Sequence, residues 1–211
     1  KNYINSKLKI FSNQTKNQYS ILNFNLKKYL KKRLITKVII PKKEDFQKLK
    51  KKINNPYLTS DINDENMMFV LSLSKLLRIK EKPFIKSLKS FVGLPHRYEI
   101  FLKKGNCTFI NDSKATNVHA TWFALESMTS TIVWIAGGVD KGNNYDELFD
   151  LVKDKVKAII VLGDDKKINK SFKSAVEKII NVGSMKEAVN LSYDLSSDGD
   201  CVLLSPACAS F

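Results

Sequence analysis

Small polar residues and lysines follow short apolar stretches at four places in the chain. In two of these places a lysine stands among small residues, Lys114 in the first and Lys141 in the second. A lysine ammonium and the free backbone N–H groups at the start of a helix both attract anions. The spacing therefore predicts a binding site for a carboxylate or a phosphate. The four stretches are 111–117 (NDSKATN), 137–142 (GGVDKG), 163–167 (GDDKK) and 205–211 (SPACASF).

Each of these residues also has an ordinary structural interpretation. Asp112 and Thr116 are common cap and turn residues, and Lys141 fits a solvated loop. Gly137 and Gly138 fit a tight turn between a strand and a helix. A functional interpretation is favoured because several polar loops are expected at one edge of the same sheet.

The elements that must position these loops are short and regular. From residue 98 onward, apolar β-branched stretches alternate with helical patterns of 8–13 residues, which predicts βαβ units and an α/β fold with a parallel sheet flanked by helices. Ligands of such sheets bind beyond the carboxyl ends of the strands. The expected strands are 98–102, 108–110, 132–136, 158–162, 181–182 and 201–204, and the expected helices are 117–128, 145–152, 171–180 and 185–195.

The first part of the chain has a weaker pattern. Gly93-Leu94-Pro95 interrupts it, and we place a domain boundary there, giving domains 1–93 and 94–211. Residues 41–60 show no clear periodicity and are left unassigned. The expected helices before the boundary are 1–12, 26–34, 63–79 and 83–92, and the expected strands are 19–23 and 37–40.

Charge is distributed unevenly along the 211 residues. The formal net charge is +15, and residues 1–60 hold 16 Lys and Arg against two acids. Only Arg33, Arg78 and Arg97 are arginines, whereas readers of nucleic acid usually rely on arginine. We favour an AT-rich coding bias, which places lysines on a solvated face, as the origin of this charge. A surface selected to bind nucleic acid is the second interpretation, and it stays open.

Several classes of protein are excluded by composition and motifs. A chain that is 43% hydrophobic and 27% charged is globular, and no apolar run approaches the ~20 residues that span a bilayer. There is no secretory signal pattern, disulfide framework or zinc spacing, so a reducing cytoplasm and no bound metal are expected. Neither a phosphate loop nor a G-x-G-x-x-G fingerprint is present, and His96 and His119 fit structural roles.

Four motifs in order resemble one known family. Gly93-Leu94-Pro95-His96-Arg97 is followed by 111–117, by 137–142 and by LSPACAS at 204–210, and this series is similar to the Mur ligase family, in its D-glutamate-adding branch. Residues 2–4 (NYI) and 13–15 (NQT) are also similar. Related ligases of the family that add other amino acids carry a different sequence in the loop where this chain has NDSKATN.

The resemblance implies half of a three-domain enzyme. Residues 1–93 would be the α/β remnant of a central ATP-binding domain, and 94–211 a Rossmann-like amino-acid-binding domain truncated at its end. The phosphate loop, the catalytic groups, the lysine that supports Mg²⁺ and the UDP site would lie upstream of Lys1, so this fragment alone would be inactive. The implied substrates are ATP, UDP-N-acetylmuramoyl-L-alanine and D-glutamate, joined through an acyl phosphate. A cytoplasmic monomer without nucleic-acid or membrane partners is expected.

The resemblance also implies roles for individual residues. The ATP site would include residues from both domains, and the D-glutamate site would lie in the second. Ile62 stands where the family has a histidine, which weakens the nucleotide-binding role implied for Asn63 and Asn66, especially that of Asn63. The nucleotide-binding residues are then Asn63, Asn66, Arg97, Asp112 and Lys114, and the D-glutamate-binding residues are Thr116, Lys141, Ser210 and Phe211.

Three other functions remain open at this point. The first is a basic nucleic-acid-binding module built on residues 1–60, against which the scarcity of aromatic residues among the lysines counts. The second is another ligase of the same superfamily, such as a folylpolyglutamate synthase. The third is a catalytically dead amino-acid-binding domain that stands alone.

Overall fold

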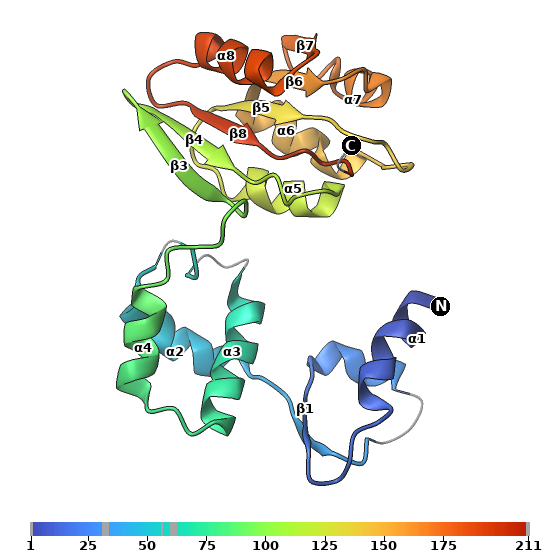
Figure 1. The fold of residues 1–211 in the computed structure, drawn as a ribbon, viewed down its shortest axis with the longest axis vertical. Helices are drawn as coiled ribbons and strands as arrows, with labels where there is room; N and C mark the ends of the chain where they lie inside the picture. Colours follow the sequence, from blue (N-terminus) through green and yellow to red (C-terminus); the bar gives the residue numbers. More distant parts are fainter. Residues whose placement is uncertain (1, 31–33, 56, 60–62, 210–211) are drawn as a thin grey trace. The chain divides into compact units, whose positions relative to one another are not determined.

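A computed structural model describes residues 2–30, 34–55, 57–59 and 63–209 of the chain. The chain divides into two compact units, Lys1–Val92 and Gly93–Phe211 (Figure 1). Each unit is described below by itself.

The second unit is built on a six-stranded sheet in the order β3-β4-β8-β5-β6-β7. Five strands are parallel, and β3 runs antiparallel to β4 at one edge. The strands are β3 (Glu99–Lys104), β4 (Cys107–Asn111), β5 (Ile132–Ala136), β6 (Val156–Leu162), β7 (Lys178–Val182) and β8 (Cys201–Leu204).

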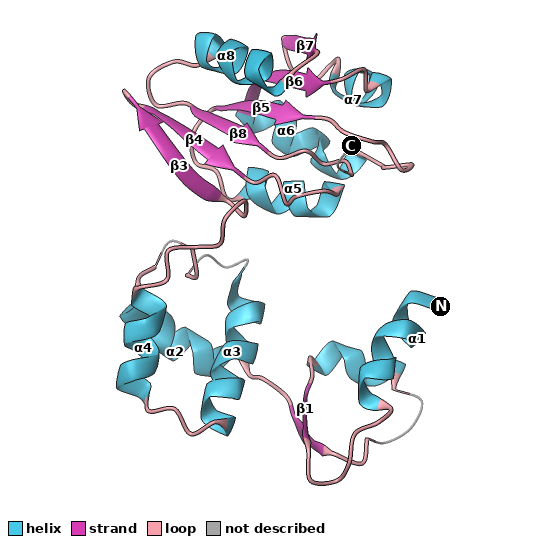
Figure 2. Ribbon diagram, viewed as in Figure 1, coloured by secondary structure: helices cyan, strands magenta, loops and turns pink. Residues whose placement is uncertain are grey.

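Helices cover both faces of this sheet (Figure 2). Alternate residues of a strand point to opposite faces, so Trp134 packs into one apolar cluster and Val133 into the other. The first cluster is covered by α5 (Val118–Glu126), α6 (Phe149–Lys155) and α7 (Lys166–Phe172), and the second by α8 (Met185–Leu195). A single-turn helix, η4 (Asp146–Leu148), precedes α6. The predicted α/β class with a mainly parallel, helix-flanked sheet is confirmed.

Two details of the prediction are wrong. The helix expected at 171–180 is found instead at Lys166–Phe172, because the side chain of Asp165 caps its start by accepting the N–H groups of Lys167 and Ile168. The chain then enters β7 at Lys178 and pairs with β6. The expected parallel direction is also wrong for β3, because the two residues between β3 and β4 form a tight hairpin.

The first unit has its apolar core among three helices, α2 (Lys43–Ile53), α3 (Asp64–Leu76) and α4 (Glu81–Lys89). Residues 41–60, to which the sequence pattern assigns no element, therefore hold α2, which presents three apolar residues to this core at helical spacing. The buried core residues are Phe46, Leu49, Ile53, Met67, Leu71 and Phe84.

The residues before Lys43 form small elements. These are α1 (Asn2–Leu8), η1 (Lys9–Phe11), β1 (Tyr19–Ile21), η2 (Phe24–Tyr29) and β2 (Lys37–Ile39), and β1 pairs with β2 in parallel. The helix expected at 26–34 is wrong where the structure describes it, since a short 3-10 helix ends at Tyr29; residues 31–33 lie outside the described part. Among the described residues, no helix has the length and apolar character needed to cross a membrane.

Candidate substrate-binding site

The four polar loops lie side by side at one edge of the six-stranded sheet. Strands β4, β8, β5 and β6 are neighbours in that order, and the loops leave their carboxyl ends. Backbone hydrogen bonds join the loops. The N–H of Asp112 donates to Leu204 O (2.8 Å), Ser205 N–H to Ile135 O (3.1 Å), and Gly137 N–H to Pro206 O (3.0 Å). The loop after β8, residues 205–209, is thus the centre of the group.

Asp112 connects the start of this unit to the β8 loop. Its buried carboxylate accepts the N–H of Tyr98 (3.0 Å) and the hydroxyl of Ser205 (3.4 Å). Tyr98 has a positive φ of 47°, which the Asp112 contact helps to hold. Burial raises the pKa of Asp112 to about 6, although the Tyr98 N–H, the Ser205 hydroxyl and the charge of Arg97 each oppose this shift. The carboxylate therefore carries a cost of desolvation at neutral pH.

Replacing Asp112 by asparagine is expected to stabilise the chain at pH 8 and to change its stability little at pH 4. The folded pKa lies above the ordinary 3.8, so the cost of charging the carboxyl is absent at low pH and complete above pH 6. Asparagine can still accept the Tyr98 N–H without a charge. Urea unfolding at the two pH values measures this, with the exposed Asp164→Asn as control. An equal gain at both pH values would contradict the expectation.

A buried cluster of Tyr145, Asp165 and Cys208 holds the far end of the β8 loop. The Tyr145 hydroxyl lies 3.0 Å from Cys208 Sγ, and both groups lie 3.4 Å from Asp165 Oδ2. The other oxygen of Asp165 accepts the two N–H groups that cap α7. Burial raises the pKa of Cys208 to about 11 and also raises the pKa of Tyr145. The thiol stays protonated at neutral pH, so this cluster shapes the loop and does not supply a nucleophile.

Sequence reasoning did not identify this cluster as part of the site. Its members come from three separate loops, and each is an unremarkable residue in its own segment. Asn143 belongs with them, because its side-chain amide donates to Ala207 O (3.3 Å). Only the packing of the loops after β5, β6 and β8 reveals the set.

Gly137 and Gly138 permit close approach of protein backbone. Both have positive φ, and a Cβ on Gly137 would lie 2.5 Å from Leu162 O. A Cβ on Gly138 would collide with Ala209 O. The ordinary interpretation of this glycine pair as a tight turn accounts for both residues. Gly142, by contrast, has φ +83° and open space where a Cβ would stand.

Exposed side chains surround this edge of the sheet. Lys114, Thr116 and Lys141 are exposed, and within the described part of the chain the ammonium groups of the two lysines have no hydrogen-bond or ion-pair partner. Asn117, and not Thr116, caps α5, since its side chain accepts the Ala120 N–H at 2.9 Å. Thr116 is therefore free for another contact. Asp140 holds the Lys141 turn by accepting two N–H groups, from Gly142 and Asn143, and these hydrogen bonds lower the pKa of its carboxyl.

The remaining predicted residues are not all brought to this edge. Arg97 is brought to this edge: it is exposed in the segment that precedes β3, near enough to Asp112 for its charge to lower the pKa of that carboxyl. Asn63 and Asn66 belong to the first unit; the Asn63 amide donates to Tyr57 O (2.9 Å), and Asn66 is exposed on α3. Ser210 and Phe211 lie outside the described residues.

Known proteins resemble the whole chain. A family model described as Mur ligase, glutamate ligase domain, matches residues 96–208. A UDP-N-acetylmuramoylalanine–D-glutamate ligase of Christiangramia forsetii is 44% identical over the full chain and 52% of its own length, and one of Bacillus mycoides is 36% identical over the full chain and 51% of its length. The chain thus spans about half the length of the curated relatives it matches.

Solved structures share the fold. A MurF ligase of Thermotoga maritima in complex with ADP superposes with a TM-score of 0.66 over 96% of this chain and 53% of its own, at 12% identity. A bifunctional folylpolyglutamate synthase/dihydrofolate synthase of Yersinia pestis gives 0.53 over 71% of this chain and 36% of its own, at 13% identity. Because the family model spans the sheet, the first three loops and the start of the fourth, and because the relatives align across the full length, the chain belongs to the Mur ligase family.

Proposed function

We propose that the complete ligase containing this chain joins D-glutamate to UDP-N-acetylmuramoyl-L-alanine in an ATP-dependent step of peptidoglycan precursor synthesis. The observation that carries the proposal is the 44% identity, over the full chain, to a relative with that name. The proposal includes a cytoplasmic monomer. Other ligases of the superfamily fit less well, because the curated relatives at this level of identity bear the D-glutamate name.

The two parts of the chain would have different tasks. Residues 1–93 would complete an ATP-binding domain, to which Asn63 and Asn66 contribute, and residues 94–211 would bind the amino acid. Arg97, Asp112 and Lys114 would lie on the nucleotide side of the second part. The D-glutamate carboxylates would contact Thr116, Lys141, Ser210 and Phe211. Support for this division comes from the two exposed lysines and the exposed threonine at one sheet edge.

The chemistry explains why cations are needed there. The substrate carboxylate attacks the γ-phosphorus of ATP and ADP leaves; the neutral amine of D-glutamate then attacks the acyl carbon, a C–N bond forms, and phosphate leaves. Negative charge gathers on the phosphoryl and acyl oxygens, and preorganised cations offset it. Lys114 and Lys141 are the cationic side chains of the two loops that could do this.

Magnesium is proposed for the complete ligase, but this chain offers little to hold it. Among the residues that the structure describes, no three His, Cys, Asp or Glu side chains are grouped to share a metal ion. Both oxygens of Asp112 are already engaged with Tyr98 and Ser205. We therefore assign the metal and the phosphate loop to parts of the ligase outside this chain, and expect the chain alone to be inactive.

A substrate panel tests the proposed function. The complete ligase would be supplied with ATP, UDP-N-acetylmuramoyl-L-alanine and one amino acid, and ADP release and the new amide would be measured. D-Glutamate is expected to support both, whereas L-glutamate, L-lysine and L-alanine are expected to support neither. Equal turnover with a different amino acid, or amide formation on a folate substrate, would overturn the proposal.

Arg97→Ala in the complete ligase is expected to raise the KM for ATP about tenfold and to leave the KM for D-glutamate unchanged. A guanidinium makes forked contacts with phosphate oxygens that a methyl group cannot make. Arg97→Lys is the matched variant and should recover only part of the loss, because it keeps the charge without the fork. A change in the KM for D-glutamate alone would contradict the expectation, because it would assign Arg97 to the amino acid and not to ATP.

A further inference from the structure

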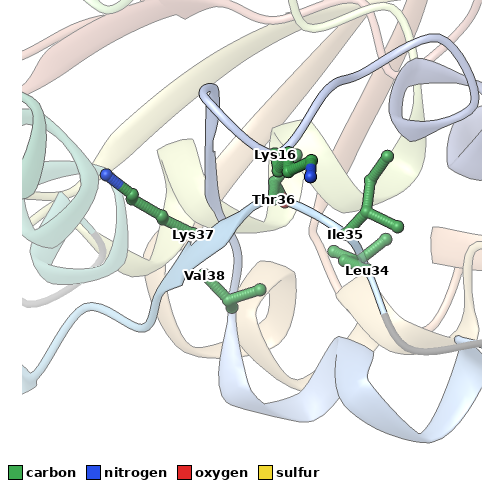
Figure 3. Close-up of a pocket in the computed structure, with 6 residues that line it drawn as sticks. All are labelled: Lys16, Leu34, Ile35, Thr36, Lys37 and Val38. Carbon is green, nitrogen blue, oxygen red and sulfur yellow. The ribbon is translucent and has the colours of Figure 1, made fainter.

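The first unit has a hollow of about 850 Å³ beside β2, lined by Lys16 and by residues 34–38 (Figure 3). Most of this lining is exposed. The hydroxyl of Thr36, which is buried, already forms a hydrogen bond with the hydroxyl of Ser20 at 2.7 Å. The six residues that line the hollow therefore offer a ligand no buried polar side chain that lacks a partner.

In the second unit, the short segment 207–209 of the β8 loop is fastened at one end to the loop that carries Thr116. The N–H of Ala207 donates to the backbone O of Ala115 (3.0 Å), the residue directly before Thr116. Ala207 has a positive φ of 59°, which is uncommon for a residue with a side chain. Such a conformation persists where the surrounding contacts fix it, and it is found most often at functional sites.

The other end of this segment is fastened to the loop that carries Lys141. The N–H of Ala209 donates to Val139 O (3.2 Å), and the N–H of Val139 donates to Ala209 O (2.8 Å). Val139 lies two residues before Lys141 in the same loop. Segment 207–209 is thus a bridge between the loop of Thr116 and the loop of Lys141, and its conformation helps to set their spacing.

The hydroxyl of Tyr145 holds this bridge from behind. It lies 3.0 Å from Sγ of Cys208, the middle residue of the bridge. It also accepts the side-chain amide of Asn143 (3.4 Å), which donates in addition to Ala207 O (3.3 Å). Tyr145 is 1% exposed, and its ring packs against Phe172 of α7 with 5.9 Å between the ring centroids. The position of the hydroxyl is therefore fixed by the packing of its ring in the core.

We propose that Tyr145 is a positioning residue for the amino acid, because its hydroxyl holds the bridge 207–209 and so fixes the spacing of the Thr116 and Lys141 loops. Two carboxylates of one substrate can contact both loops only if their separation matches this spacing. D-Glutamate has one methylene more than D-aspartate between its carboxylates, so the spacing selects D-glutamate over the shorter acid. The inference rests on the proposed function, in which the carboxylates of D-glutamate contact Thr116 and Lys141.

Tyr145→Phe in the complete ligase removes the hydroxyl and keeps the ring. Asp165 keeps the thiol of Cys208 as a donor. The Asn143 amide keeps Ala207 O as its acceptor, so the variant is expected to fold. The KM for D-glutamate should rise about five- to tenfold, which corresponds to one hydrogen bond, while kcat and the KM for ATP change less than about twofold. An unchanged KM for D-glutamate, or an equal rise in the KM for ATP, would overturn the proposal.

The ratio of kcat/KM for D-glutamate to kcat/KM for D-aspartate is a second readout, which a general loss of stability does not change. In Tyr145→Phe this ratio should fall about tenfold, since one methylene in a fitted site changes kcat/KM by about 10- to 200-fold. Tyr193→Phe is the matched control, because Tyr193 lies on α8 at the other face of the sheet, against Phe109. The control should keep the wild-type ratio. Equal ratios for the wild type and Tyr145→Phe would overturn the proposal.

Two substitutions of Cys208 test the same hydrogen bond from the side of the bridge. Cys208→Ser keeps a group that can bond to Tyr145, and Cys208→Ala removes it. The alanine variant should raise the KM for D-glutamate as Tyr145→Phe does, and the serine variant should raise it less than about twofold. Equal KM values for the two variants would overturn the proposal.

Failure of the proposed function would be visible separately. A wild-type ligase that does not use D-glutamate would refute the proposed function. The variants would then be measured with the amino acid that the wild type does use, and an unchanged KM for it in Tyr145→Phe would refute the role of Tyr145.

Discussion

Lys141→Ala in the complete ligase is expected to raise the KM for D-glutamate about 10- to 100-fold while changing the KM for ATP less than about twofold. A hydrogen bond to a charged group contributes about 1.5–3 kcal/mol, and each 1.36 kcal/mol corresponds to a factor of ten. Lys141 is exposed, and Asp140 fixes its turn through two backbone N–H groups. Initial rates over a range of each substrate would separate the two constants.

Lys166→Ala is the matched control, because Lys166 is an exposed lysine of the neighbouring loop, with 87% of its side chain accessible. It should leave both constants unchanged. A Lys141 variant with an unaltered constant for D-glutamate would show that this lysine is an ordinary loop cation, which is the other interpretation of its sequence.

Of the glycine-to-alanine substitutions in the four loops, Gly137→Ala is expected to be the most destabilising. It should lower the free energy of unfolding by about 3 kcal/mol or more. Its Cβ would stand 2.5 Å from Leu162 O and 2.9 Å from Leu162 N, and these are backbone atoms that cannot rotate away. The φ of +116° adds strain for any residue with a side chain. Urea unfolding of the 211-residue chain, followed by circular dichroism, measures the loss.

Gly142→Ala separates backbone strain from collision. Gly142 also has a positive φ, +83°, but no atom lies within 4 Å of a Cβ placed there. This variant should therefore lose only about 1–2 kcal/mol. Equal losses at the two positions would mean that the loop after β5 moves freely away from Leu162, contrary to the hydrogen-bonded arrangement described above.

Much of the second unit could be predicted because local and tertiary preferences agree there. The helix at 185–195 and the strand at 201–204 were predicted with the observed ends. Ser184 caps the helix by accepting the Glu187 N–H, and the strand is a continuous apolar run in the middle of the sheet. Continuous apolar strands are typical of buried parallel sheets.

The errors arose where two patterns compete. Residues 171–180 contain apolar residues at helical spacing, yet Lys178–Val182 pairs with β6 because a sheet edge is available there. The direction of β3 was signalled by the dipeptide Gly105-Asn106, which is a hairpin signal that the alternation of strands and helices outweighed. In the first unit, α2 was overlooked although Phe46, Leu49 and Ile53 have helical spacing.

The site was predictable as a set of loops but not as a set of contacts. Placing four polar segments after four strands followed from the rule for α/β sheets. That Asp112 is buried against Ser205, or that Asp165 meets Cys208, depends on the strand order, in which β8 stands between β4 and β5. Strand order is set by long-range packing, which short sequence patterns do not reveal.

The indole of Trp134 gives the sheet a built-in optical reporter. Its buried N–H donates to the backbone O of Ser205, the first residue of the β8 loop, at 2.7 Å. The other tryptophan, Trp122, is half-buried on α5. Indole emission is sensitive to the partner of this N–H, so a shift of the loop changes the fluorescence of the unlabelled protein. Events at the polar edge can therefore be followed in real time from inside the sheet.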